Sequence, residues 1–200
     1  GSYSNFYEYA ENMTCVDSNA KISLLSIENY ELQLYESVDT GATWSKTKLS
    51  PGDDGDYYSA LMLCTDEGKR VIIYGVNTYI NYGQSISTWD CFKYGTYAYV
   101  ETGSGWQKTT LSPPSTVSNY GLLPYGIYRH SNGQIHAFLH HYGWNNYGGK
   151  LYECIYDPVT NVWTSPVNIM NATYSYIDRA TVYYSRIAED PYGNFSLMFR

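Results

Sequence analysis

The chain has 200 residues, of which 44% are hydrophobic, so it can bury the core of one domain and is too apolar to be disordered. It carries 12 basic and 19 acidic side chains, a formal net charge of −7, and its Lys and Arg residues form no cluster. Binding to nucleic acid needs a basic surface that neutralises phosphates, so we exclude a nucleic-acid partner. No apolar run approaches the length of a membrane span, so we expect none.

Tyrosine is unusually frequent, with 25 copies, and is joined by five tryptophans and five phenylalanines. Aromatic residues favour the half-buried, pleated surface of a β-strand. An aromatic ring can also lie against the C–H face of a sugar while its polar tip stays in water. The excess therefore indicates a strand-rich fold and also suits a surface that binds carbohydrate.

Two kinds of β-hairpin alternate along the chain. The first kind, a strand, a Gly/Asn/Asp turn and an apolar strand, occurs at 13–27, 62–76, 127–139 and 183–199. The second kind follows each of the first three copies and contains Trp44, Trp106 or Trp163 ahead of its last strand. This internal repetition predicts a unit of four antiparallel strands that recurs radially.

We therefore expect an all-β fold, a β-propeller of four-stranded antiparallel blades, in a single region over 1–200. About three and a half blades are present, with approximate bounds 9–50, 58–112 and 120–169 and a half blade at 178–200. Blade two carries an insert at 77–93, rich in Tyr, Asn, Gly and Ser, which predicts a long loop on one rim. No sustained 3.6-residue stripe occurs, so helices should be few.

The segment 135–140 shows the period-two pattern of a strand most clearly. In it, Ile135, Ala137 and Leu139 alternate with His136, Phe138 and His140, so the two sets should face opposite ways.

The four cysteines are Cys15, Cys64, Cys91 and Cys154, and they follow no metal-ligand spacing. Cys15 and Cys64 occupy equivalent positions on neighbouring blades. Such positions should lie too far apart for a disulfide, so we expect buried free thiols.

The segment 37–44 reads S-x-D-x-G-x-T-W, with its fixed positions filled by Ser37, Asp39, Gly41, Thr43 and Trp44. It resembles the Asp-box, or BNR repeat, of the sialidase superfamily. The resemblance implies a structural turn between the third and fourth strands of a blade, on the rim away from the usual active face. We therefore expect Asp39 to bind backbone amides rather than act in catalysis. We expect Trp44 to pack between strands as an anchor.

The resemblance to sialidases also implies an arginine triad that grips the substrate carboxylate, a Tyr–Glu nucleophile pair and an Asp. The sequence departs from this pattern. It has only five arginines and lacks the Arg-Ile-Pro signature, because Arg186-Ile187 is followed by Ala188. No catalytic residue is therefore transferred from the family.

Polar and aromatic residues concentrate between 128 and 144. Related propeller lyases, which cleave acidic polysaccharides by β-elimination, combine His, Tyr and Arg as base, acid and charge neutraliser. The catalytic candidates by that comparison are Arg129, His136, His140, Tyr142, Arg179 and Arg186. The candidates for ligand contact are Tyr128, His130, His141 and Trp144. The alternative is that these are rim residues and hydrogen-bonded strand histidines.

A metal site and a cofactor are not expected. His136 and His140 share a strand face but stand roughly 13 Å apart, and His140 and His141 point to opposite faces. Neither pair can close around one ion without ligands from elsewhere.

Three functions fit these observations. The favoured one is a carbohydrate-recognition module whose partner is a glycan or polysaccharide, as in secreted enzymes and virion attachment proteins. The second is a glycoside hydrolase or polysaccharide lyase acting on acidic glycans, and the third is a structural propeller for protein contacts. An extracellular, cell-surface or virion location is expected with the first.

The predicted blades leave exposed sheet edges at both ends, which natural proteins rarely tolerate. We therefore expect remaining blades beyond residue 200, an outer strand supplied by 5–10, or self-association.

Overall fold

The computed structural model describes residues 13–52, 56–79, 92–111, 122–141, 150–171 and 186–198. Within these ranges every regular element is a β-strand and every pairing is antiparallel, which confirms the all-β prediction. No helix in these ranges is long and apolar enough to cross a membrane.

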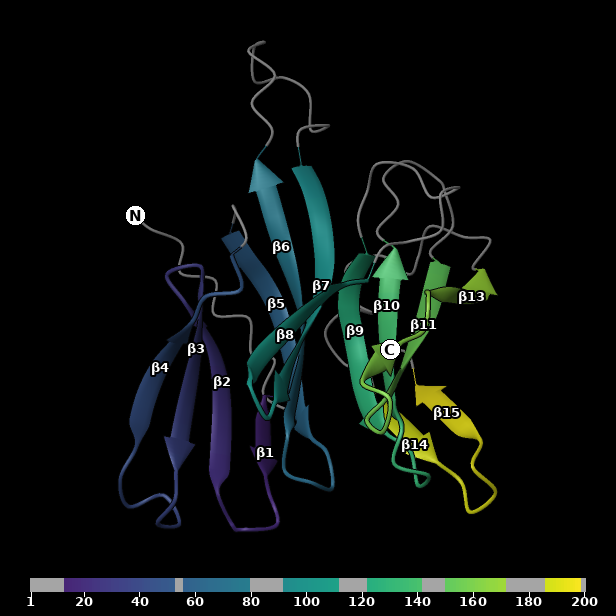
Figure 1. Ribbon diagram of the computed structural model, residues 1–200. Helices are drawn as coiled ribbons and strands as arrows, with labels where there is room; N and C mark the ends of the chain where they lie inside the picture. The colour runs from purple at the N-terminus through teal and green to yellow at the C-terminus, as the bar shows by residue number, and fades with distance from the viewer. Residues whose placement is uncertain are drawn as a thin grey trace.

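Four sheets follow one another along the chain, numbered here 1 to 4 (Figure 1). Sheet 1 contains β1 (Thr14–Val16), β2 (Ile22–Glu28), β3 (Glu31–Ser37) and β4 (Ser45–Leu49). Sheet 2 contains β5 (Asp56–Cys64), β6 (Arg70–Tyr79), β7 (Phe92–Thr102) and β8 (Gly105–Thr110). Sheet 3 contains β9 (Leu122–Arg129), β10 (Ile135–His141), β11 (Lys150–Asp157), β12 (Val162–Trp163) and β13 (Val167–Asn171). Sheet 4 contains β14 (Arg186–Glu189) and β15 (Phe195–Met198).

The strand order within each sheet is the order along the chain, except that β12 and β13 both pair with β11 as two pieces of one outer strand. Neighbouring sheets meet along their first strands: β5 lies against sheet 1, β9 against sheet 2, and β14 against β9. Each pair of consecutive hairpins predicted from the sequence thus forms one sheet, and successive sheets lie side by side.

The prediction of a loop over 77–93 is wrong at both of its bounds. Residues 77–79 still belong to β6 and pair with residues 92–94 of β7, so the ladder continues into the predicted insert. The Thr and Tyr residues there favour a strand in spite of the polar composition around them. Residues 80–91 lie outside the described ranges.

Sheet 2 is buried on both faces, and β6 shows why its sequence is almost continuously apolar. Val71 and Ile73 point to the core layer shared with sheet 3, while Ile72 and Tyr74 point to the layer shared with sheet 1. All four are fully buried. A strand covered on both faces has no side chains that point to solvent, so apolar and polar residues no longer alternate along it.

Sheet 3 is likewise covered on both faces. Ile135, Ala137 and Leu139 pack toward sheet 2, and Phe138 packs toward sheet 4. The predicted alternation in 135–140 is therefore confirmed, and the face that carries the two histidines is an interface between sheets.

The antiparallel order gives each sheet two distinct ends (Figure 1). At one end lie the turns after the first strand, 17–21, 65–69, 130–134 and 190–194, and the turns after the third strand; we call this the turn end. At the other end the second strands stop and the next sheets begin, and we call this the connection end. The turn end is at the bottom of Figure 1 and the connection end at the top.

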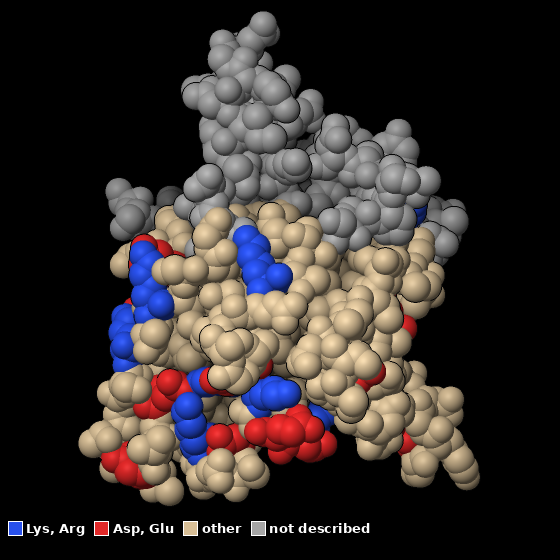
Figure 2. Space-filling view, viewed as in Figure 1, with Lys and Arg blue, Asp and Glu red and all other residues tan. Residues whose placement is uncertain are grey.

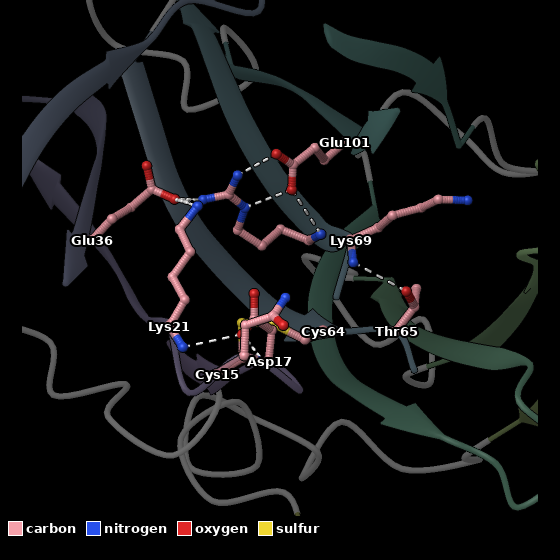
Figure 3. The surroundings of a disulfide bond; sticks show 10 residues. Cys15, Asp17, Lys21, Glu36, Cys64, Thr65, Lys69 and Glu101 are labelled. Atoms are coloured by element: carbon pink, nitrogen blue, oxygen red, sulfur yellow. Dashed lines mark hydrogen bonds and ion pairs between the residues drawn. A yellow bond between two sulfur atoms is a disulfide. The ribbon is translucent and has the colours of Figure 1, made fainter. Parts of the chain in front are cut away.

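A disulfide joins Cys15 of β1 to Cys64 of β5, with their Cα atoms 5.7 Å apart, so the prediction of free thiols is wrong for this pair (Figure 3). The first strands of successive sheets approach one another, and equivalent residues can therefore come within bonding range. Cys154 is free and buried, as expected, and Cys91 lies outside the described ranges.

A buried charge network lies beside the disulfide (Figure 3). The Arg70 side chain is 7% exposed and forms ion pairs with Glu36 of sheet 1 and Glu101 of sheet 2. Lys21 adds a second cation at 2.5 Å from Glu36. Burial alone would raise the pKa of Glu101, but the hydrogen bonds and charge of Arg70 outweigh it and the pKa lies below its ordinary value.

Candidate functional site

The candidate residues read from the sequence separate to opposite ends of the molecule. Tyr128, Arg129 and His130 close β9 at the turn end, and His136 lies opposite Tyr128 in the neighbouring strand. His140 lies at the connection end, because β10 crosses the sheet between the two histidines. Proximity along the sequence thus does not produce one cluster.

Arg129 does not face a common site with the histidines. Its side chain is 44% exposed and donates a hydrogen bond to the carboxylate of Asp66 at 2.5 Å, in the first turn of sheet 2. This contact links sheets 2 and 3 at the turn end. Arg129 therefore acts in the described structure as an inter-sheet contact.

His130 occupies a repeated structural position. In each first turn one side chain accepts backbone N–H groups of its own turn, and the four acceptors are Asp17, Thr65, His130 and Asp190. The Nδ1 atom of His130 accepts from the N–H of Asn132 at 3.1 Å, so its Nε2 carries the hydrogen. That Nε2 lies 3.3 Å from both the Gly193 carbonyl and the Glu189 carboxylate of sheet 4.

Glu189 anchors sheet 4 to the first turn of sheet 3. Its carboxylate accepts from the Ser131 hydroxyl at 2.7 Å and from the Ser131 N–H at 3.1 Å. The hydrogen bond from the Ser131 hydroxyl is the main cause of a lowered pKa for this carboxyl. Tyr128 adds a longer hydrogen bond at 3.4 Å.

Phe195 of β15 completes the contact between sheets 3 and 4. Its ring lies 4.6 Å from the His136 ring and 5.3 Å from each of the Tyr128 and His130 rings. His136 donates from Nδ1 to the Glu153 carboxylate at 2.7 Å. Tyr128, His130 and His136 are thus tied into an inter-sheet contact, which is the structural alternative weighed from the sequence.

Sequence reasoning missed Glu153, Glu189 and Phe195 in this contact. A signal existed for Glu153, since a carboxylate in the middle of β11, between Tyr152 and Cys154, is expected to have a hydrogen-bonding partner. Glu189 and Phe195 gave no signal, because their roles depend on how sheet 4 docks.

The turn at 37–44 lies between β3 and β4, where the repeat predicted it. The Asp39 carboxylate accepts from the Thr43 hydroxyl at 2.5 Å, the Thr43 N–H at 2.8 Å and the Ser37 hydroxyl at 2.8 Å. These hydrogen bonds lower the pKa of Asp39 to about 2, the Thr43 hydroxyl contributing most. Gly41 has φ +93°, a conformation that glycine adopts without strain.

Trp44 differs from the expected anchor. The residue is 42% exposed, and its indole N–H donates to the Gly41 carbonyl of its own turn at 3.0 Å. The tryptophans of the other two outer turns do pack inward: Trp106 stacks on Tyr99 at 4.9 Å and Trp163 lies 5.1 Å from Tyr156. Trp44 instead covers its own tight turn.

The pKa of Asp39 predicts an acid-dependent stability. Because the folded-state pKa is depressed from 3.8 to about 2, the contribution of the carboxylate is present above pH 4 and is lost as the pH falls toward 2. Replacing Asp39 with alanine should therefore lower stability at pH 6, with a difference that shrinks between pH 4 and pH 2. Thermal unfolding of both proteins across this range measures it, and a difference independent of pH would contradict the assignment.

The connection end carries the remaining described candidate, His140, close to Tyr125. A β-bulge inserts Tyr125 between Pro124 and Gly126, and both side chains are buried, Tyr125 in the layer shared with sheet 4. Burial raises the pKa of Tyr125 to about 12, so its phenol is protonated. Bulges commonly re-aim a side chain beside a binding site.

The remaining candidate residues lie in, or next to, the segments that connect strands at this end. Tyr142 and Trp144 belong to the connection between β10 and β11, and Arg179 precedes β14; all three lie outside the described ranges. His141 and Arg186 are described only as backbone, at the end of β10 and the start of β14, both at the connection end.

The described carboxylates gather at the turn end, and Figure 2 shows much of the red surface toward the bottom of the molecule. The turns and strand ends there hold Asp17, Asp39, Asp66, Glu67, Asp157, Glu189 and Asp190. At the connection end, the described carboxylate side chains are Glu28 and Glu31, which pair with Lys46 at 2.6 Å and Lys48 at 2.5 Å. Both of these described carboxylate side chains are therefore paired with lysines.

Metal and thiol chemistry gain no support from the described part of the chain. No group of three or more His, Cys, Asp or Glu side chains there could hold a metal ion. Burial raises the pKa of the Cys154 thiol to about 12, so it is not a nucleophile at neutral pH.

Comparison with known proteins gives the fold. No family model matches the sequence, and no curated protein matches it. A protein of unknown function from Dyadobacter fermentans superposes with a TM-score of 0.63 at 16% identity, covering 94% of this chain and 60% of that chain. The α-L-arabinanase of Penicillium chrysogenum, solved with arabinobiose, gives 0.56 at 13% identity, covering 92% and 55%.

The sialidase NanB, solved with Optactamide, gives a TM-score of 0.53 at 16% identity, covering 92% of this chain and 26% of that chain. The chain thus spans three fifths or less of the length of each of these proteins. Likeness at such identities establishes the fold alone. The predicted fold class is confirmed: the chain has the β-propeller fold of glycosidases such as arabinanases and sialidases.

Proposed function

We propose that this chain is a carbohydrate-recognition part of a β-propeller and that it binds a glycan or polysaccharide at its connection end. The observation that carries the proposal is the shared fold with an arabinanase and a sialidase, both of which act on carbohydrates. The turn end suits this role less well, because Tyr128, His130, His136 and Arg129 are engaged in contacts between sheets there.

The sequence of the connections supports the same end. The segments that join the described strands there are rich in aromatic residues, namely Tyr82, Trp89, Tyr120, Tyr142, Trp144, Tyr147, Tyr174, Tyr176, Tyr183 and Tyr184. Such rings supply the stacking surface that sugars need. Connecting segments positioned by a rigid scaffold are also where binding residues concentrate.

As part of this proposal, we assign the turn at 37–44 as an Asp-box. Its hydrogen bonds from Ser37 and Thr43 to Asp39 and the positive φ of Gly41 support this assignment. The turn is then a structural element at the end opposite to the glycan.

A glycan array probed with the full chain tests the proposal, and paired variants test the location. Replacing Trp144 with alanine should weaken binding to the recognised glycan at least tenfold, because the indole ring on which a sugar would stack is lost. Replacing Trp44, at the turn end, should leave the affinity unchanged. A blank array would count against glycan recognition, and equal losses for the two variants would count against the connection end.

Catalysis is a second candidate, favoured by one arrangement. Tyr125 and His140 lie at the connection end of sheet 3, and Arg186 begins the facing strand β14 of sheet 4. Tyrosine, histidine and arginine are the residue types of a β-elimination site. Incubation with acidic polysaccharides, followed by absorbance of an unsaturated product, distinguishes a lyase from a binding module. Release of sugar from sialosides would instead indicate a hydrolase.

An extracellular, cell-surface or virion location belongs to the same proposal. The Cys15–Cys64 disulfide supports it, because disulfides persist in oxidising compartments. We also propose that the edges of sheets 1 and 4, which the described residues leave unpaired, are covered by remaining blades or by self-association, with no nucleic-acid partner. Light scattering of the purified chain measures self-association.

A further inference from the structure

The disulfide between Cys15 and Cys64 joins a short strand to a long one. β1 has three residues, whose pairing within the described ranges is with β2. Thr14 and Val16 on either side of Cys15 are exposed, and Cys15 itself is only half-buried. Because Cys15 is only half-buried, a reductant can reach the bond at this residue.

The rest of sheet 1 packs on sheet 2 without the help of β1. The core layer between the two sheets is formed by Leu25, Leu32, Leu34 and Leu49 on one side and Ala60, Met62, Ile72, Tyr74 and Val76 on the other. From the segment 13–21, Met13 and Cys15 contact this layer, and both are only partly buried. Detaching the segment would leave the layer in place.

The turn that follows β1 carries contacts to both sheets (Figure 3). Lys21 reaches Glu36 at 2.5 Å and thereby joins the charge network of Arg70. Asp17 lies so close to Gly68 that a Cβ added to this glycine would meet the Asp17 Cβ at 3.2 Å. Movement of β1 therefore carries this turn away from sheet 2, while Glu36 keeps Arg70 as its partner.

We propose that the disulfide is a redox-controlled lock on the segment 13–21. A thiolate of a dithiol reductant attacks the Cys15 sulfur, forms a mixed disulfide and releases the Cys64 thiolate. The second thiol of the reductant then displaces the Cys15 thiolate, so the reductant is oxidised to a disulfide and the two cysteines take up two protons as thiols. The segment detaches, the edge of β2 becomes exposed, and the four sheets stay folded.

Hydrogen exchange of the full chain, followed by mass spectrometry, tests the lock with dithiothreitol as the reductant. Reduction should accelerate exchange at least tenfold in peptides covering 13–21 and leave β6 and β10 protected, and reoxidation should restore protection. No change on reduction would overturn the proposal, as would a loss of protection in all four sheets. Peptide mapping without reductant that finds no Cys15–Cys64 peptide would overturn it as well.

Variants give an independent readout. The double variant Cys15→Ser and Cys64→Ser should exchange rapidly over 13–21 without reductant and should not respond to dithiothreitol. Cys154→Ala, which removes the buried free thiol, should keep the response of the unaltered protein. A double variant that still responds to reductant would refute the lock.

Discussion

Replacing Arg70 with methionine is expected to lower the free energy of unfolding by about 3 to 5 kcal/mol, the cost of removing one partner from a buried ion pair. The guanidinium is 7% exposed and is the cation shared by Glu36 and Glu101, from two different sheets. Methionine fills the space but leaves two partly buried carboxylates facing each other, with Lys21 as the nearest described counter-charge. Urea unfolding followed by tryptophan fluorescence measures the loss.

Arg129 provides the matched control for this prediction. It also joins two sheets by an ion pair, but it is 44% exposed and its partner Asp66 is 68% exposed. Exposed pairs contribute about 1 kcal/mol or less, so Arg129→Met should have a small effect. Equal losses for the two variants would show that the charge network around Arg70 does not hold sheets 1 and 2 together.

Replacing Phe138 with alanine is expected to cost about 3 to 5 kcal/mol, the usual range for removing a buried phenyl ring. The side chain is 1% exposed and lies in the layer between sheets 3 and 4, with its ring 6.0 Å from that of Phe195. Because Phe138 contributes to the apolar layer that Ile187 and Phe195 of sheet 4 pack against, the cavity should weaken the docking of sheet 4 first. Chemical unfolding gives the total loss, and hydrogen exchange should show β14 and β15 losing protection before β6.

Tyr192 is the control in sheet 4, since its side chain is 90% exposed at the tip of the last turn. Tyr192→Ala should change the free energy of unfolding by less than about 0.5 kcal/mol. If Phe138→Ala were equally mild, sheet 4 would not be held by an apolar layer, and the propeller arrangement of sheets 3 and 4 would be wrong.

The repeat in the sequence was sufficient to predict the sheets, because each four-strand unit is specified locally. Apolar strands joined by short turns mark the hairpins, a recurring tryptophan marks each outer hairpin, and β10 shows its two faces in its alternation. The pattern could not show that both faces of sheets 2 and 3 are covered. That coverage depends on how sheets stack, which no single strand encodes.

The candidate site was harder to predict than the fold. Tyr128, His130 and His136 lie within nine residues of the sequence, yet their positions are explained by the docking of Glu189 and Phe195 from a distant segment. The same holds for the disulfide, where spacing on a generic propeller argued against a bond that convergence of β1 and β5 permits. Long-range packing therefore decided these outcomes.

The most direct test of the account is to map a bound glycan on the isotope-labelled chain by NMR, using a ligand identified on the array. We predict chemical-shift changes at the connection end, at His140, Tyr125 and the backbone of Arg186, with the turn-end residues His130 and Asp39 unperturbed. Shifts confined to the turn end, or no shifts with any glycan that the array scores as bound, would contradict the claim that this propeller recognises carbohydrate at its connection end.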